Sequence, residues 1–329
     1  MLLFSIRRLL SSVLVLLASS VLVFFLAAAS ADPLAVYRTR QPPPPPEFFA
    51  AKAAEYGLDK PIPVRYWNWL THIVRGDFGN NIDSQPVRPE LFDRLAVTAR
   101  MVAAAMVLAV ILAIVVGVVT AVRANRPSDY FFTTISYMLI ALPVFWLAVL
   151  LKEYVAIRLN DLVGQRVLFT IGEESPGISD YGTTSEILRD RLGHLVLPTI
   201  ALAALNFAAW SRFQRASMLD VMSSDYMRLG RAKGLPYRKV LVKHGLRNAL
   251  IPLTTVVALG VGGILGGALI TETVFQWHGL GQYLLQDGLG QQDVNVVLGW
   301  LMVSAFFVVL FNLIADLVYA VLDPRIRLS

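Results

Sequence analysis

The side chains that carry acid-base, nucleophilic and metal chemistry are few in this sequence and lie far apart. Its 329 residues include no cysteine, which excludes a disulfide framework, a thiolate metal site and a cysteine nucleophile. Its four histidines are dispersed along the chain, at His72, His194, His244 and His278. There is no H-E-x-x-H zinc motif and no G-x-S-x-G nucleophile motif. We therefore expect no intramembrane hydrolase, no catalytic residue and no metal site.

A nucleotide site is not predicted either. ATP hydrolysis on a P-loop needs G-x-x-x-x-G-K-[ST], and this pattern does not occur. A glycine-rich run does occur, but it lies inside an apolar stretch, at Gly260, Gly262, Gly263, Gly266 and Gly267. There small residues allow helices to pack closely, and mobility during transport is the alternative interpretation. Any energy from ATP must therefore come from another polypeptide.

One stretch has a composition suited to binding a partner. Residues 212–247 hold nine basic and two acidic side chains. Because glycine favours the end of a helix and proline its start, Gly234-Leu235-Pro236 predicts two short helices joined by a tight turn. The basic residues alternate with apolar ones, namely Leu229, Leu235, Val240 and Leu241. Such a surface suits docking of a protein, whereas enforcement of topology and contact with anionic lipid is the alternative.

The elements that position this stretch are expected to be membrane-spanning helices. The chain is 56% hydrophobic and 16% charged, with a mean hydropathy of +0.60, and is thus more apolar than an average soluble domain. A span needs roughly 20 apolar residues, since the hydrocarbon core is about 30 Å thick. Six long uncharged runs occur, at residues 9–30, 101–122, 130–151, 195–211, 249–271 and 294–315. The expected fold class is an all-α polytopic membrane protein with about six transmembrane helices.

Charges between these runs alternate by side, as expected because Lys and Arg resist translocation. Residues 272–293 carry three acidic and no basic side chains, and residues 158–191 carry six acidic and four basic ones. We place both outside and the basic stretch in the cytoplasm. Other basic residues agree with two cytoplasmic termini: Arg7, Arg8, Arg123, Arg126, Arg325 and Arg327. The overall charge of +6 therefore indicates a cell-membrane protein in contact with the lipid bilayer and not a nucleic-acid partner.

Four parts of the chain are predicted. Residues 1–30 are a transmembrane helix, although the Ala29-Ser30-Ala31 run also imitates a cleavage site; the apolar run of about 21 residues is long for a signal peptide. Residues 31–96 are an extracytoplasmic segment with a stiff spacer at Pro42 to Pro46. Residues 97–322 are the transmembrane core with the cytoplasmic loop 219–248, and residues 323–329 are a cytoplasmic tail. Four neighbours in the outer segment predict an interfacial amphipathic helix: Tyr66, Trp67, Trp69 and Leu70.

Ionisable and polar residues near the spans are the positions where an ion or a polar solute could interact with the spans. Four ionisable ones, Lys152, Glu153, Glu272 and Asp316, lie near span ends, where an interfacial position is expected; an ion-coupled secondary transporter would need charges at the midplane. Pro143 and Pro198 are expected to kink or begin helices. Five polar side chains are candidates for a translocation pathway or for hydrogen bonds between helices: Thr133, Thr134, Tyr137, Asn206 and Asn312.

The basic loop resembles the EAA-type loop of ABC importer permeases in its dipeptide/oligopeptide form. The resemblance rests on YMRLGRAKGL at residues 226–235 and HGLRNALIP at residues 244–252. Further strings fall in the family's order along almost the whole chain: GLDKP (57–61), GDFG (76–79), LPVFW (142–146), HLVLP (194–198), ETVF (272–275), GLG (279–281) and DPRIR (323–327). The chain departs from the family in having Arg228-Leu229-Gly230 in place of the EAA tripeptide, and in its proline-rich outer segment.

The resemblance implies a type I ABC importer transmembrane domain that imports peptides. It also implies partners: a second homologous permease, cytoplasmic ATPase subunits that bind ATP and Mg, and an extracytoplasmic substrate-binding protein. This chain would bind no cofactor itself. Nickel or another small solute is the alternative substrate. The residues implied in coupling to the ATPase are Arg231, Ala232, Lys233, Gly234, Leu235, Tyr237, His244 and Arg247.

Overall fold

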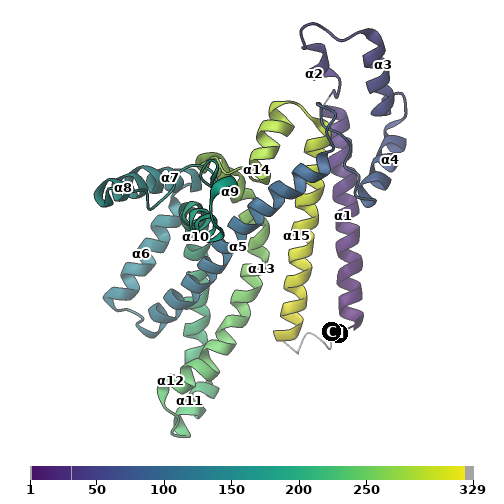
Figure 1. The fold of residues 1–329 in the computed structure, drawn as a ribbon. Coiled ribbons are helices and arrows are strands. Elements are labelled where there is room, and N and C mark those ends of the chain that lie inside the picture. The colour runs from purple at the N-terminus through teal and green to yellow at the C-terminus, as the bar shows by residue number, and fades with distance from the viewer. Residues whose placement is uncertain (1, 31, 323–329) are drawn as a thin grey trace. The chain divides into compact units, whose positions relative to one another are not determined.

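The structure is a computed structural model that describes residues 2–30 and 32–322 (Figure 1). Within these ranges it is all-α, with one isolated bridge between Asn80 and Pro86, so the predicted fold class is confirmed. The predicted tail 323–329 and its DPRIR string lie outside the described residues. The long helices are α1 (Leu2–Ser30), α5 (Val87–Val122), α10 (Thr184–Ser223), α13 (Arg247–Phe275) and α15 (Val294–Leu322).

In the described part of the chain, four helices are long and apolar enough to cross a membrane: Ser5–Ala29, Val87–Val122, Thr184–Ser223 and Val294–Ile314. Two bent pairs of helices pass the same test of length and composition when each pair is taken together. Pro127–Ala141 and Val144–Val163 meet at 109°, and Tyr237–Gly260 and Gly262–Phe275 meet at 41°. The predicted six spans are reached when each bent pair counts as one.

The predicted third span, residues 130–151, is divided into two helices. Helix α6 (Pro127–Ala141) ends before Leu142, and α7 (Val144–Leu150) begins after Pro143. Proline lacks the N–H that would continue the helix and pushes Leu142 into an extended conformation, with ψ 129°. The chain continues through a π-helical segment, η1 (Leu151–Ile157), and α8 (Arg158–Val163). Pro198, by contrast, lies inside α10 and begins no helix, and a kink at Pro198 stays a prediction.

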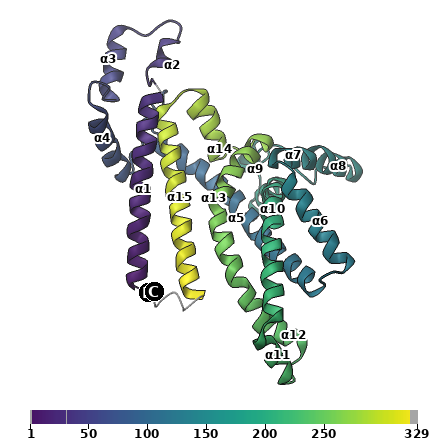
Figure 2. The same ribbon diagram turned by 180° about the vertical axis from the view of Figure 1, so that it is seen from behind.

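The chain divides into two compact units. The first contains Ala99–Trp277 and the described parts of Met1–Ser5 and Phe311–Ser329. In it α10 packs against α6, α7 and α13, and the views in Figures 1 and 2 show α10 and α13 side by side. Gly260 makes this possible, because a Cβ there would lie 2.8 Å from the Trp210 ring. Close packing is thus confirmed at Gly260, whereas Gly263 faces open space.

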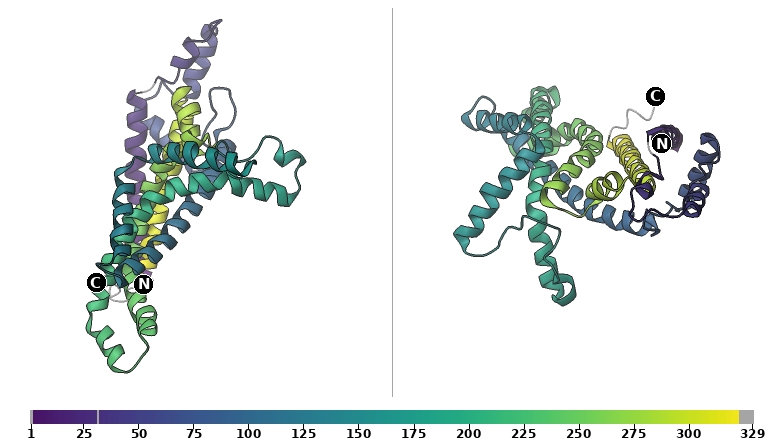
Figure 3. Two further views of the ribbon diagram at one scale, coloured as in Figure 1. Left: turned by 90° about the vertical axis from the view of Figure 1, so that its left-hand side faces the viewer. Right: turned by 90° about the horizontal axis from the view of Figure 1, so that it is seen from above.

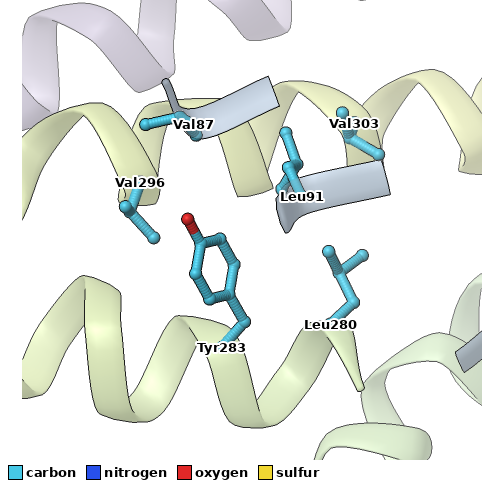
Figure 4. Packing of buried hydrophobic residues seen from close by; sticks show 6 residues of the cluster. All are labelled: Val87, Leu91, Leu280, Tyr283, Val296 and Val303. Carbon is cyan, nitrogen blue, oxygen red and sulfur yellow. The ribbon is translucent and has the colours of Figure 1, made fainter. Parts of the chain in front are cut away.

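The second unit contains Ile6–Thr98 and His278–Leu310. Its core is a cluster of buried side chains from the start of α5, α14 (Leu280–Tyr283) and α15 (Figure 4). The members are Val87, Leu91, Leu280, Tyr283, Val296 and Val303. The π-helical segment η3 (Leu284–Gly290) connects α14 to the loop before α15. These apolar side chains come from two sequence segments that are almost 200 residues apart.

The outer segment of this unit forms α2 (Ala35–Arg38), α3 (Pro46–Glu55) and α4 (Ile62–Val74). Pro46 is the first residue of α3, so the spacer is shorter than predicted. The predicted amphipathic helix around Trp67 is confirmed as α4. Its Tyr66 hydroxyl lies 2.9 Å from the Ser20 hydroxyl, and the Trp69 ring lies 5.2 Å from that of Phe24. Helix α4 therefore packs on α1, and retention of α1 in the mature chain stays a prediction.

Asp293 joins the loop before α5 to the start of α15. Its Oδ2 accepts the Ile82 N–H at 2.7 Å, and its Oδ1 accepts the N–H groups of Asn295 and Val296 at 3.0 and 3.1 Å. The Asn295 amide in turn donates to the Asn80 carbonyl at 2.7 Å. Asp293 is 2% exposed, and burial raises its pKa above the usual value of 3.8.

Candidate functional site

A helical hairpin connects α10 to α13. It consists of α11 (Asp225–Ala232), α12 (Tyr237–Val240) and a π-helical segment, η2 (Leu241–Leu246), and Figure 3 shows it projecting beyond the ends of α10 and α13. Gly234 adopts the left-handed conformation, with φ +75°. Its N–H donates to the Arg231 carbonyl at 2.9 Å, and the Leu235 N–H donates to the Gly230 carbonyl at 3.4 Å. This is a Schellman motif, so the predicted helix, tight turn and helix are confirmed.

The inside of the hairpin is apolar and tightly packed. Met227 and Val240 are fully buried, and a Cβ on Gly230 would lie 3.1 Å from the Val240 side chain. A Cβ on Gly245 would lie 3.2 Å from the Met218 side chain and 3.4 Å from the Met227 side chain. Leu241 packs in the cluster of Ala121, Met218 and Ala249. The expectation that Val240 and Leu241 are surface anchors is therefore wrong, because Val240 at the end of α12 and Leu241 at the start of η2 pack inward.

The outside of the hairpin is cationic. Arg231, Ala232, Lys233 and Gly234 are exposed and follow one another into the turn. The Arg231 guanidinium lies over the Tyr237 ring, with 5.0 Å to its centroid. Leu235 is half-buried, whereas Leu229 is 56% exposed. Cation, aromatic ring and apolar side chain thus share one exposed surface.

The last two predicted coupling residues lie further from the turn. His244 is half-buried in η2, and Arg247 is exposed at the start of α13. The His244 carbonyl accepts the Asn248 side-chain amide at 2.8 Å. These residues belong to the base of the hairpin, whereas Arg231 through Tyr237 form its tip.

Sequence reasoning missed a buried ion pair between α6 and α10, the helix that precedes the hairpin. Arg215 of α10 binds Asp129 of α6 in a bidentate manner, with Nε to Oδ1 at 2.8 Å and Nη2 to Oδ2 at 2.7 Å. Asp129 is 3% exposed and also accepts the Asn125 N–H at 2.9 Å. Arg215 had been counted only as one charge of the basic loop. The two partners are 86 positions apart, so no local pattern could have paired them.

The polar pathway candidates are divided among three helices. Thr133, Thr134 and Tyr137 lie on α6, Asn206 lies on α10 and Asn312 lies on α15. The Thr133 hydroxyl donates to Asp129, and the Asn206 amide donates to the Leu202 carbonyl of its own helix.

The side of α6 that faces α10 carries Ser136 and Tyr137. The Tyr137 ring is covered by the Arg212 guanidinium at 4.2 Å from its centroid, and Ser136 lies 3.3 Å from Ser211. Thr133 and Tyr137 therefore contribute to helix contacts, while Thr134 is exposed. Their role in a pathway stays a prediction.

The ionisable residues near span ends do not share one environment. Glu153 is exposed and Lys152 and Asp316 are half-buried, but Glu272 has no exposed surface. Glu272 is therefore packed inside the protein, and the position expected for it at the membrane interface stays a prediction. In residues 2–30 and 32–322 there is no group of three His, Asp or Glu side chains that could hold a metal ion.

Comparison with known proteins places the chain in a family. The family described as "Binding-protein-dependent transport system inner membrane component" matches residues 113–328, and its N-terminal counterpart matches residues 1–90. The chain is 43% identical over 279 residues, 85% of each chain, to "Oligopeptide transport system permease protein OppB" of Mycobacterium tuberculosis (strain ATCC 25618 / H37Rv).

Two further relatives are more distant. The chain is 37% identical over 275 residues, 83% of each chain, to "Oligopeptide transport system permease protein AppB" of Bacillus subtilis (strain 168). It is 34% identical over 285 residues, 83% of this chain and 84% of the other, to "Dipeptide transport system permease protein DppB" of Escherichia coli (strain K12). The chain therefore belongs to the inner membrane components of binding-protein-dependent transport systems.

Proposed function

We propose that this chain is the membrane-spanning permease subunit of an ATP-binding-cassette importer that carries peptides into the cytoplasm. The observation that carries the proposal is the exposed cationic hairpin between α10 and α13, in a chain whose relatives are named oligopeptide and dipeptide permeases. A hairpin of this kind is connected to long helices at both ends. Movement of its tip is therefore transmitted directly to α10 and α13.

The hairpin would dock on a cytoplasmic ATPase subunit, which binds ATP and Mg. The Arg231 guanidinium and Lys233 ammonium supply positive charge, Leu229 supplies an apolar contact, and Gly234 permits the turn that brings them to the tip. ATP binding would bring two such hairpins together, one from this chain and one from a second homologous permease. Hydrolysis would then reset the outward and inward access of the pathway between the two permeases.

Topology follows from the same assignment. Docking on a cytoplasmic ATPase requires the hairpin to lie inside the cell, which places both termini in the cytoplasm when six spans are counted. The segment with α2, α3 and α4 would then lie outside, on the side where a binding protein delivers peptide.

Two substitutions at Gly234 test the coupling role. Gly234→Asp places a negative charge at the cationic tip, whereas Gly234→Asn has the same shape without the charge. A Cβ at this position meets nothing within 4 Å, and Asp and Asn both tolerate the left-handed conformation. We expect Gly234→Asp to abolish uptake of labelled di- and oligopeptides and co-purification of the ATPase, with the protein still in the membrane. Gly234→Asn should retain most of both.

The outcome separates coupling from substrate. Normal peptide uptake by Gly234→Asp would contradict the coupling role. Uptake of nickel or another small solute, but of no peptide, by cells with the unaltered chain would contradict the substrate and leave the coupling role in place. Peptide uptake that persists without ATP but needs an ion gradient would favour a secondary transporter.

A further inference from the structure

Two cavities lie in the unit formed by Ile6–Thr98 and His278–Leu310. The first, which we call the polar cavity, has a volume of about 510 Å³, and its polar lining includes Lys60, Arg65, Asn68, His72 and Asn295. The second, the apolar groove, has a volume of about 530 Å³, and its lining includes Leu16, Leu17, Leu70, Val303 and Phe306. Phe78 lines both, so the two spaces adjoin.

The cavities follow each other along the same two helices. Helix α1 lines the groove at Val13 and the polar cavity at Phe24, while α15 lines the polar cavity at Asn295 and the groove at Phe306. Each helix covers this distance in 11 residues, or about 17 Å at 1.5 Å per residue. One leaflet of a bilayer holds about 15 Å of hydrocarbon, half of the roughly 30 Å core. The pair of cavities thus has the length of one lipid molecule in one leaflet.

Two cations of the polar cavity, Lys60 and Arg65, are not paired with its carboxylates. The Arg65 Nε is buried without a hydrogen-bond partner, and among the described residues neither Arg65 nor Lys60 has a carboxylate within ion-pair distance. The two acidic lining residues are already engaged. Glu55 binds Lys52 at 2.9 Å, and Asp77 accepts the Gly79 N–H at 2.9 Å. Arg65 as a whole is half-buried, but a buried N–H without a partner is costly, and phosphate matches the donors of a guanidinium well.

We propose that these cavities bind one phospholipid, with its phosphate beside Arg65 and Lys60 and an acyl chain in the apolar groove. A lipid is the molecule that supplies an anion and a hydrocarbon chain in this order. The groove is lined mainly by apolar side chains, with Ser20 and Arg88 as the polar exceptions, so hydrocarbon suits it better than water does. A helix from another subunit would fill the groove but leave Arg65 without an anion. The GLDKP and GDFG strings, which form part of the polar cavity, thereby acquire a role in lipid binding.

The test measures phospholipid bound to the full-length chain. The chain is purified in mild detergent, stripped of loosely held lipid, incubated with phosphatidylglycerol bicelles and analysed by native mass spectrometry. We expect Arg65→Gln and Leu17→Trp each to lower phospholipid retention about tenfold, which corresponds to about 1.4 kcal/mol. Arg75→Gln and Leu14→Trp are the matched controls, since Arg75 and Leu14 are exposed and line neither cavity. Both controls should retain lipid as the unaltered chain does.

Three results would overturn the proposal. The first is an unaltered chain that retains no phospholipid, and the second is equal loss in Leu17→Trp and Leu14→Trp. The third is displacement of the bound lipid by a dipeptide or by glycerol 3-phosphate, since either would bind without the groove. Arg65→Lys keeps the charge and should recover part of the retention lost in Arg65→Gln. Equal thermal unfolding of all variants confirms that the differences do not arise from misfolding.

Discussion

Replacing Arg215 with methionine should destabilise the unit that contains α6 and α10. The substitution keeps the length of the side chain but removes both hydrogen bonds to Asp129, at 2.8 and 2.7 Å. Asp129 then remains buried with a full negative charge, because only 3% of its surface is exposed. Loss of the partner is therefore more costly than loss of the attraction alone.

The magnitude follows from what remains around Asp129. Removing one partner of a buried ion pair costs about 3–5 kcal/mol. Asp129 keeps the Asn125 N–H at 2.9 Å and the Thr133 hydroxyl at 3.3 Å, and the Arg215 side chain is 29% exposed. We therefore expect the lower end, about 3 kcal/mol. Adding Asp129→Asn removes the buried charge, so the double variant should lose only about 1 kcal/mol.

The assay is reversible unfolding of the full-length chain in detergent, followed by the helical circular dichroism signal. Arg228→Met is the matched control, because Arg228 is 75% exposed and lies 3.6 Å from the exposed Asp225. It should change the free energy of unfolding by no more than about 0.5 kcal/mol. If the double variant lost as much as the sum of the two single variants, the account of a buried uncompensated charge would be refuted.

Three further predictions concern the other unit. Burial raises the pKa of Asp293 above 3.8, so this group's contribution to stability is complete below pH 3.8 and is lost as the pH rises through the higher folded value; Asp293→Asn should remove that decline in pH-dependent unfolding. Gly79→Ala should cost about 1–3 kcal/mol in thermal unfolding, because φ is +76° and the new Cβ would lie 2.9 Å from the Asn295 amide. Tyr66→Phe removes the hydroxyl contact with Ser20 and should cost about 1 kcal/mol, and unchanged protease resistance of the outer segment would contradict this.

Much of the hairpin between α10 and α13 could be predicted because its signals are local. Glycine at the helix end and proline after it specify the turn within three residues, and the structure forms the expected Schellman motif at Gly234. Which side chains of the hairpin are buried and which are exposed was harder to predict. Val240 and Leu241 follow a basic residue and look like surface anchors, yet they pack against Gly230 and Met218. Which face of a short helix is buried depends on the neighbour that covers it.

The broken third span shows the same limit. Its hydropathy is that of one continuous span, and Pro143 alone indicates a break. The angle of 109° between the two parts depends on how α7 packs against α10 and α13. The hydropathy of a segment indicates how long its apolar run is, but not the direction in which its helices run.

The sequence by itself determined the all-α membrane class, the positions of the apolar runs, the turn at Gly234 and the family, since each depends on composition or on neighbours a few residues apart. Tertiary structure alone decided the pairing of Asp129 with Arg215, the hydrogen bond from the Ile82 N–H to Asp293 at the start of α15, and the two adjoining cavities. The physical reason is separation along the chain. Partners that lie 86 or 211 residues apart leave no periodic signal, and only packing of the helices brings them within hydrogen-bond distance.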